Sequence, residues 1–281
     1  MPFDVFLQVL LAAVFHAAWN FGARRVSGNV GVMWFGQFVG SLICLPFAIA
    51  QMSAETSLLD LAWICLPTGV LHAVYFWMLA QAYRHGDISL VYPIARGTGV
   101  AGTAVLAFFL LGEQLSLTGF SGIATICAGI LLLGLSGKNV QANNRGIVMA
   151  LCTGAAIAGY SLVDKRAVGQ INPVVYGVGL WLISAVLFAP AALWKYPHEV
   201  RDALKNKKRY ILLVGSGSVG TYLVILFAFQ RANVSYVAAV REFAVVMGAA
   251  LGFIVLKERF TITKAWGIAA IVLGLVLVKA A

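Results

Sequence analysis

Two arginines lie deep inside long apolar stretches of this sequence. Arg96 belongs to the apolar segment 88–111, and Arg241 lies at nearly the same depth in the segment 234–256. An ionisable side chain at such a depth is costly in a bilayer, so it usually faces a watery cavity or the interior of a helix bundle. The planar guanidinium group is well shaped for a carboxylate, phosphate or phosphonate. We therefore expect both arginines to face one cavity and to bind an anionic group.

The residues beside these arginines suggest how such a cavity would bind. Tyr92 lies four residues before Arg96, on the same helical face, where its ring could stack on the guanidinium or on a ligand. Pro93 removes one backbone hydrogen bond in this turn and predicts a kink. Glu242 directly follows Arg241, and we include it among the binding residues. The competing interpretation is that Glu242 neutralises an arginine as a fixed structural partner.

Polar and aromatic side chains recur at helical spacing in the first and third apolar segments. His16 and Asn20 are four residues apart, and Trp19 lies beside Asn20, so all three could share one face. His72 and Tyr75 form a similar stripe in the third segment. We expect these side chains to line the cavity. The alternative for each stripe is ordinary packing and hydrogen bonding between neighbouring helices.

The sixth apolar segment carries Tyr160 and Asp164, again four residues apart. We expect Tyr160 to contribute to the cavity. For Asp164 we favour an ion pair with Lys165 or Arg166 at the membrane surface over a charge inside the cavity. Tyr222, in the eighth segment, is a weaker candidate for the cavity wall.

These side chains must be positioned by membrane-spanning helices, because 61% of the 281 residues are hydrophobic and only 11% are charged. Soluble domains carry about 25% charged residues. The apolar stretches are long and do not alternate with polar residues, which favours helices over a β-barrel. We expect an all-α membrane protein. Its ten predicted spans are residues 3–22, 30–50, 61–82, 88–111, 119–136, 146–164, 173–194, 210–230, 234–256 and 263–279.

No pattern in the sequence indicates an enzyme. The four cysteines lie in or beside apolar segments and lack the spacing of metal ligands. The stretch Gly97-Thr98-Gly99 lies in a membrane segment and lacks the lysine of a phosphate-binding loop. The formal net charge of +10 resides mainly in short loops and does not indicate nucleic-acid binding. We expect no catalytic residue, no cofactor, no metal site and no nucleic-acid partner.

The two halves of the chain resemble each other when the sequence is aligned with itself at a shift of 145 residues, which aligns Arg96 with Arg241. Each half contains five spans, so the second half enters the membrane from the opposite side. We expect two inverted five-helix repeats, residues 1–137 and 138–281, with the site near the membrane midplane where they meet. Further matched positions are Glu113 with Glu258, Gly122 with Gly267, and Gly129 with Gly274.

The matched glycines are seven residues apart in each half, which places them on one helix face and permits close helix contact. We expect spans 119–136 and 263–279 to pack, either against each other or across a homodimer interface.

Lys and Arg residues are unevenly distributed between the two sides of the predicted bundle. One side holds fourteen of them and the other holds four. Short loops rich in Lys and Arg stay in the cytoplasm. We therefore expect both termini to lie outside the cytoplasm. The predicted cytoplasmic loops are 22–29, 83–87, 137–145, 257–264 and the long polar loop 195–209.

Short motifs throughout the chain resemble the EamA branch of the drug/metabolite transporter superfamily. They are His16-Ala17-Ala18-Trp19-Asn20, Leu111-Gly112-Glu113, Tyr160-Ser161-Leu162-Val163-Asp164-Lys165, Val240-Arg241-Glu242 and Leu256-Lys257-Glu258. The resemblance implies ten spans from a duplicated five-helix unit, and a secondary transporter of small metabolites similar to bacterial amino-acid exporters. Lys257 departs from the pattern, because a symmetric pair of motifs would have glycine there.

Together with this resemblance, the residues predict an inner-membrane carrier that works by alternating access. The expected substrate is a small metabolite with an anionic group, an amino acid or related zwitterion that is exported. One alternative is an uptake carrier for a small amine, organic anion or phosphonate. Another is a flippase for a lipid-linked substrate. The expected partners are the substrate and the bilayer, with proton coupling through Glu242, His16 or Asp164 and a homodimer as further options.

Overall fold

The computed structural model describes residues 1–23, 26, 28–53, 57–135, 143–257 and 261–281. Glu258, which the repeat matches to Glu113, lies outside them. Within the described residues the chain is helical and contains no strand. Ten stretches of this helical structure are long and apolar enough to cross a membrane, which confirms the predicted fold class and number of spans. The elements are α1 (Phe3–Ala23), α2 (Val30–Gln51), α3 (Leu58–His85), α4 (Ile88–Leu111), α5 (Leu117–Leu135), α6 (Asn144–Ala167), α7 (Pro173–Pro190), η2 (Ala191–Lys195), α8 (Pro197–Asn206), α9 (Lys208–Arg231), α10 (Val234–Val240), α11 (Phe243–Leu256) and α12 (Ile262–Ala280).

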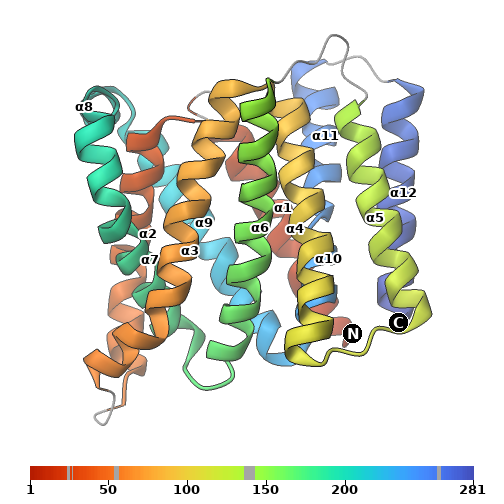
Figure 1. Cartoon of the computed structure of the whole chain (residues 1–281), viewed down its shortest axis with the longest axis horizontal. Helices are drawn as coiled ribbons and strands as arrows, with labels where there is room; N and C mark the ends of the chain where they lie inside the picture. The colour runs from red at the N-terminus through yellow and green to blue at the C-terminus, as the bar shows by residue number, and fades with distance from the viewer. Residues whose placement is uncertain (24–25, 27, 54–56, 136–142, 258–260) are drawn as a thin grey trace.

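The helices are arranged as an inverted repeat requires (Figure 1). Helix α3 packs on α6 and α7, and its counterpart α9 packs on α1 and α2. Helix α4 packs on α6, and its counterpart, formed by α10 and α11, packs on α1. Helix α1 starts at the edge of the bundle where both termini lie, whereas α6 starts at the opposite edge. The second half therefore crosses the membrane in the opposite sense to the first.

Helices α5 and α12 lie side by side (Figure 1) and meet through the repeated glycines. A Cβ atom on Gly122 would lie 2.9 Å from the carbonyl oxygen of Gly274, and one on Gly274 would lie 2.6 Å from that of Gly122. Gly129 and Gly267 approach each other in the same reciprocal way, at 2.7 and 3.0 Å. Backbones this close leave no room for a side chain. The prediction that these spans pack is confirmed, and the contact is made within one chain.

The single predicted span 234–256 is broken in its middle. Helix α10 ends at Val240 and α11 begins at Phe243. Across the break, the N–H of Ala244 donates to the carbonyl of Arg241 at 3.1 Å, and that of Val245 donates to the carbonyl of Glu242 at 2.9 Å. These bonds span three residues instead of four and tighten the turn. Arg241 and Glu242 therefore lie at a discontinuity of a membrane helix, a common location for binding groups in carriers.

The segment 195–209, expected to be a polar loop, instead contains the short helix α8. Pro197 at its first position and Glu199 in its first turn both favour the start of a helix. One carboxylate oxygen of Glu199 accepts the N–H of Val30 at 2.8 Å, and the other forms an ion pair with Arg84. Helix α8 thus covers the beginning of α2 and the end of α3.

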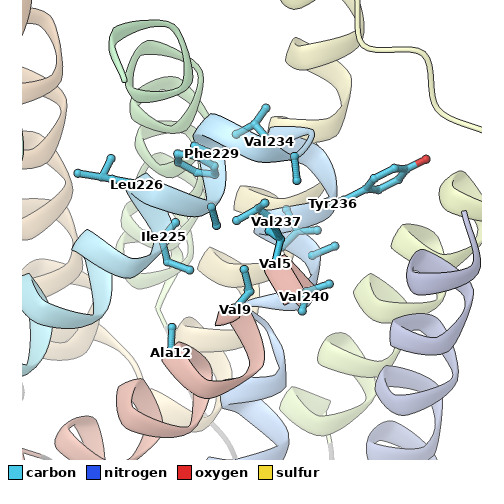
Figure 2. Close-up of a cluster of buried hydrophobic side chains, with 14 of the residues drawn as sticks. Val5, Val9, Ala12, Ile225, Leu226, Phe229, Val234, Tyr236, Val237 and Val240 are labelled. Atoms are coloured by element: carbon cyan, nitrogen blue, oxygen red, sulfur yellow. The ribbon is translucent and has the colours of Figure 1, made fainter. Parts of the chain in front are cut away.

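Apolar packing closes the bundle on the side where the termini lie. Figure 2 shows Val5 and Val9 of α1 beside Phe229 of α9 and Val237 of α10. All four side chains are fully buried in one hydrophobic cluster. Because these helices come from both repeats, the cluster joins the two halves at this end.

A carboxylate from the first repeat holds the start of α10 at the same end. Glu113, which follows α4, accepts the N–H of Val234 at 2.6 Å and that of Ser235 at 3.3 Å. It also accepts the hydroxyl of Ser235 at 2.7 Å. A carboxylate at a helix N-terminus satisfies free N–H groups and complements the helix dipole.

Helices α4 and α11 end in the same backbone conformation although the residues differ. Gly112 has a φ of 66°, and its counterpart Lys257 has a φ of 53°. This left-handed conformation costs an ordinary residue roughly 1–2 kcal/mol. The departure that the sequence shows at Lys257 is therefore a change of side chain and not of backbone.

Candidate functional site

A cavity between the two repeats runs from the middle of the bundle toward the side opposite the termini. Its lining extends from Ala12 and Ile225 to Val26, Met33 and Tyr83. Its volume of about 100 Å³ is several times the ~10–15 Å³ that one water needs, so it suits a small metabolite. Nine of the ten predicted binding residues line it: His16, Trp19, Asn20, His72, Tyr75, Tyr92, Arg96, Tyr160 and Arg241.

The tenth predicted residue, Glu242, lies behind the cavity wall and pairs with Arg96 of the other repeat. Nε of Arg96 donates to Oε2 of Glu242 at 3.0 Å, and Nη2 donates to Oε1 at 2.5 Å. Both residues are buried, and the geometry is the bidentate one that guanidinium and carboxylate groups favour. The ring of Tyr92 lies 5.9 Å from the guanidinium carbon of Arg96. The positive charge of Arg96 is therefore balanced within the protein.

Arg241 lines the same cavity without such a partner. It is 5% exposed, and its Nε is buried and finds no acceptor among the residues that the structure describes. No ion pair joins Arg241 to any residue in the described part of the chain, since Glu242 is taken by Arg96. Removing a charge from water without a counter-charge is expensive. Arg241 therefore contributes an uncompensated positive charge to the cavity wall.

The predicted stripe on α1 faces the cavity. The rings of His16 and Trp19 meet edge to face with centres 5.1 Å apart, and the side-chain amide of Asn20 donates to the carbonyl of His16 at 2.9 Å. Nε1 of Trp19 is buried and has no acceptor among the described residues. The stripe thus presents one free hydrogen-bond donor together with aromatic surface.

Aromatic rings from α3, α6 and α9 form the opposite wall. His72 stacks on Tyr160 with ring centres 4.1 Å apart and an interplanar angle of 26°. Tyr75 and Tyr222 each meet Tyr160 edge to face, at 5.7 and 5.8 Å. Tyr222, a weaker candidate from the sequence, therefore belongs to the same wall as the predicted residues.

Asp164 points into the bundle, and the predicted ion pair with Lys165 or Arg166 is wrong. Asp164 is fully buried and accepts hydrogen bonds from three hydroxyl groups. Lys165 donates instead to backbone carbonyls, including that of Ala232 at 2.9 Å, and Arg166 donates to the carbonyl of Leu110 at 2.6 Å. Successive residues of a helix point in different directions, so Asp164 turns inward while the two cations bind chain ends near the surface.

Several cavity residues were missed by reasoning from the sequence, and two of them are instructive. Trp181 of α7 and Thr221 of α9 both line the cavity. Thr221 precedes Tyr222, and this polar pair in an apolar segment was a usable signal. The signal beside Trp181 was weaker, because Ser184 is the one polar residue three or four positions from it.

Ten spans, two inverted repeats and a cavity between them that is lined by arginine and aromatic side chains are the features of a multi-pass membrane carrier. The sequence profile described as the EamA-like transporter family matches residues 5–135 and, a second time, residues 144–280. The chain therefore belongs to the EamA-like transporter family, whose members move small molecules across membranes.

Individual relatives agree with this assignment. The chain is 27% identical to the uncharacterized transporter YwfM of Bacillus subtilis, over 98% of this chain and 93% of that protein. It is 29% identical to the multidrug transporter EmrE of Escherichia coli, over 27% of this chain and 70% of that protein. It is 33% identical to the spermidine export protein MdtI of Shigella flexneri, over 22% of this chain and 56% of that protein. A crystal structure superposes with a TM-score of 0.77 over 98% of this chain and 95% of its own, at 16% identity, which shows the fold alone.

Proposed function

We propose that this protein is an inner-membrane exporter that moves an amino acid or a related zwitterion by alternating access. The observation that carries the proposal is the buried guanidinium of Arg241 on the cavity wall, which forms no ion pair with any described residue and whose Nε has no acceptor among them. A fixed cation in a cavity of low dielectric constant attracts an anionic ligand, and a guanidinium can bind a carboxylate through two hydrogen bonds. Arg96 adds no net charge, because Glu242 balances it.

The charge of the cavity argues against a polycation as substrate. Among the described residues that line it, two are arginine and none is Asp or Glu. A polyamine such as spermidine would meet a guanidinium group without a counter-charge, and like charges repel at short range. We therefore propose a different substrate class for this chain than the one named for MdtI.

The remaining lining supports a zwitterion with an apolar side chain. Nε1 of Trp19 is a free donor that could bind the second carboxylate oxygen. An ammonium group can bind over an aromatic face, and an apolar group can pack against aromatic rings. Eight aromatic side chains line the cavity: Trp19, Tyr75, Phe76, Tyr83, Tyr92, Tyr160, Trp181 and Tyr222.

Counterflow into proteoliposomes tests the substrate class. The labelled probes are phenylalanine, leucine, aspartate, spermidine and an aminophosphonate, each with its unlabelled form inside the vesicles. We expect counterflow of the uncharged amino acids and none of spermidine. Arg241→Ala should lower that counterflow at least about tenfold, a loss of ~1.4 kcal/mol in binding. Arg241→Lys should restore only part of it, because the lysine lacks the planar fork. The control is Arg201→Ala on α8, an exposed arginine outside the cavity.

Other outcomes of the same assay would replace the proposal. Counterflow of spermidine alone would contradict it. Counterflow of the aminophosphonate alone would favour an anion carrier. In a separate assay, movement of a labelled lipid between leaflets would favour a flippase. The direction of transport is tested in cells: overproduction should lower the cellular content of the identified substrate, whereas accumulation would indicate uptake.

The orientation of the chain stays a prediction and is tested by labelling. Asn206→Cys on α8 and Gln114→Cys after α4 place exposed thiols on opposite sides of the bundle. In intact cells, a reagent that does not cross membranes should label the cysteine at 114 and spare the one at 206. The reverse pattern would mean that the termini are cytoplasmic.

A further inference from the structure

Asp164 is a buried carboxylate that the proposed substrate site does not use. It is 0% exposed. Its Oδ1 accepts the hydroxyl of Thr68 of α3 at 2.5 Å and that of Tyr176 of α7 at 2.7 Å. Its Oδ2 accepts the hydroxyl of Tyr222 of α9. The adjacent Lys165 donates to backbone carbonyls instead. In the described part of the chain, Asp164 therefore has hydroxyl partners but no cation.

A hydrogen-bonded path joins this carboxylate to the cavity. His72 lines the cavity, and its Nδ1 lies 3.1 Å from Oγ1 of Thr68 and 3.0 Å from the carbonyl oxygen of the same residue. The hydroxyl of Thr68 in turn donates to Asp164. Tyr222 also lines the cavity and donates to the other carboxylate oxygen. A proton can therefore pass between the cavity and Asp164 along these hydrogen bonds, without bulk water reaching the carboxylate.

Asp164 also lies toward the closed side of the bundle. It is within one turn of the end of α6 at Ala167, and Tyr176 belongs to the first turn of α7. Both positions are on the side of the termini, which the apolar cluster of Figure 2 closes. A carboxylate between the cavity and a closed end can exchange protons with the open side of the membrane in this state. After the carrier changes state, it can exchange protons with the other side.

We propose that Asp164 is the proton-binding site that couples transport to a proton gradient, with His72 and Thr68 as its path from the cavity. A proton that reaches His72 leaves its Nδ1 for Oγ1 of Thr68, while the hydroxyl proton of Thr68 moves to Oδ1 of Asp164. The imidazole ends neutral, the hydroxyl is restored and the carboxylate becomes a carboxylic acid.

Protonation changes the bonds that join four helices. Hydrogen bonds to an ionised carboxylate are roughly twice as strong as those between neutral groups. Neutral Asp164 would therefore hold the hydroxyls of α3, α7 and α9 less firmly, which favours rearrangement of these helices around α6. The inference rests on the proposed transport function, because coupling requires a transported substrate.

A proton fits this site better than a sodium ion. Hydroxyl groups already contact Oδ1 at 2.5 and 2.7 Å, so a metal ion would have to displace them, whereas a proton would not. The other titratable groups that face the network are Cys65 of α3, Tyr160 of α6 and Arg241 across the cavity. Of these three side chains, only the arginine, Arg241, is of a type that is charged at neutral pH.

The test compares two assays on the full-length protein in proteoliposomes, with phenylalanine as the probe. Counterflow at equal pH on both sides needs binding and the conformational change, but no net proton movement. Accumulation driven by a pH gradient needs all three. We expect Asp164→Asn to keep counterflow close to wild type and to lose gradient-driven accumulation at least about tenfold. The control is Asp202→Asn, a partly exposed aspartate on α8 outside the spans.

A second variant keeps the test informative if Asp164→Asn does not fold. Thr68→Val removes the path through His72 and Thr68 but leaves the carboxylate and its bond to Tyr222. Accumulation should therefore slow while counterflow persists. Normal accumulation by Asp164→Asn would overturn the inference. Accumulation of phenylalanine that is driven by a sodium gradient at constant pH would overturn it as well.

A measurement without substrate separates this inference from the proposed function. If no amino acid shows counterflow, the proposed substrate is wrong, and tryptophan fluorescence then tests Asp164 in detergent. The ring of Trp181 lies 6.0 Å from that of Tyr222 and should report the change at Asp164. Wild type and Asp202→Asn should show a fluorescence step on pH titration that Asp164→Asn lacks. A wild type without this step would contradict the inference.

Discussion

Arg96 and Arg241 occupy matched positions in the two repeats and are both 5% exposed on the same cavity wall. They nevertheless differ in charge balance, since Arg96 is held by Glu242 and Arg241 has no ionic partner among the described residues. The shift that relates the repeats shows why. It places Glu242 on Gly97, so the residue that would be the symmetric partner of Arg241 has no side chain.

This comparison separates two roles that look identical in the sequence. Arg96 joins the repeats through its ion pair with Glu242, whereas we propose that Arg241, whose matched partner position is Gly97, binds an anion. The substitutions below change this asymmetry, or the symmetry around it, from the largest expected effect to the smallest.

Breaking the pair of Arg96 should cost the most. Arg96→Ala leaves Glu242 buried without a partner, which typically costs about 3–5 kcal/mol. We expect a large loss of folded protein and a lower midpoint of thermal unfolding in detergent. The double variant Arg96→Met with Glu242→Leu should recover most of this stability, because an apolar pair carries no desolvation cost. Arg96→Ala with wild-type stability would show that the pair does not hold the repeats together.

Supplying the missing carboxylate should disable Arg241 without unfolding the protein. A Cβ atom at residue 97 would lie 4.0 Å from its nearest neighbour, Cγ2 of Ile130, so a side chain can start there. Gly97→Glu should neutralise Arg241 and lower amino-acid counterflow at least about tenfold. Gly97→Gln has the same shape without the charge and should retain more activity. Equal losses in both variants would point to a steric effect and weaken the charge argument.

Where the repeats stay symmetric, matched substitutions should have matched effects. Gly129→Ala and Gly274→Ala each force α5 and α12 apart, at a cost of about 1–3 kcal/mol. The two variants should lower the unfolding midpoint by similar amounts. Gly248→Ala on α11 is the control, since a Cβ there meets nothing within 4 Å. A large effect at only one of the two contact glycines would show that the contact is less symmetric than the backbone suggests.

The smallest effect is expected at the ends of α4 and α11. Lys257→Gly should stabilise the protein by up to about 1 kcal/mol, because glycine adopts the left-handed conformation without strain. Gly112→Lys should destabilise it by a similar amount. Thermal unfolding of the two variants, side by side, checks both signs, and the same sign in both would refute the argument.

The sequence was sufficient for the properties that depend on local composition and on the repeat. The number of spans follows from the length of apolar stretches, and the packing of α5 on α12 follows from glycine spacing. Nine of the ten predicted residues line the cavity. An ionisable or polar residue deep in an apolar segment usually faces a cavity or the interior of the bundle.

The partners of these residues depend on tertiary packing and were not predictable in the same way. The pair of Arg96 and Glu242 joins positions 146 residues apart. In the sequence Glu242 directly follows Arg241, with which it forms no ion pair among the described residues. The direction of Asp164 depends on the rotation of α6 relative to three other helices. The break between α10 and α11 lies in a stretch without glycine or proline, so no local signal marks it.

The glycine at residue 97 also has a consequence for how this protein could have been assembled. Two identical five-helix subunits in an inverted pair would have the same residue beside both arginines, so both would be paired or both would be free. One free and one paired arginine require two halves of different sequence, and a single chain that contains both repeats provides them. The charge of the cavity therefore depends on the two repeats having different sequences at this position.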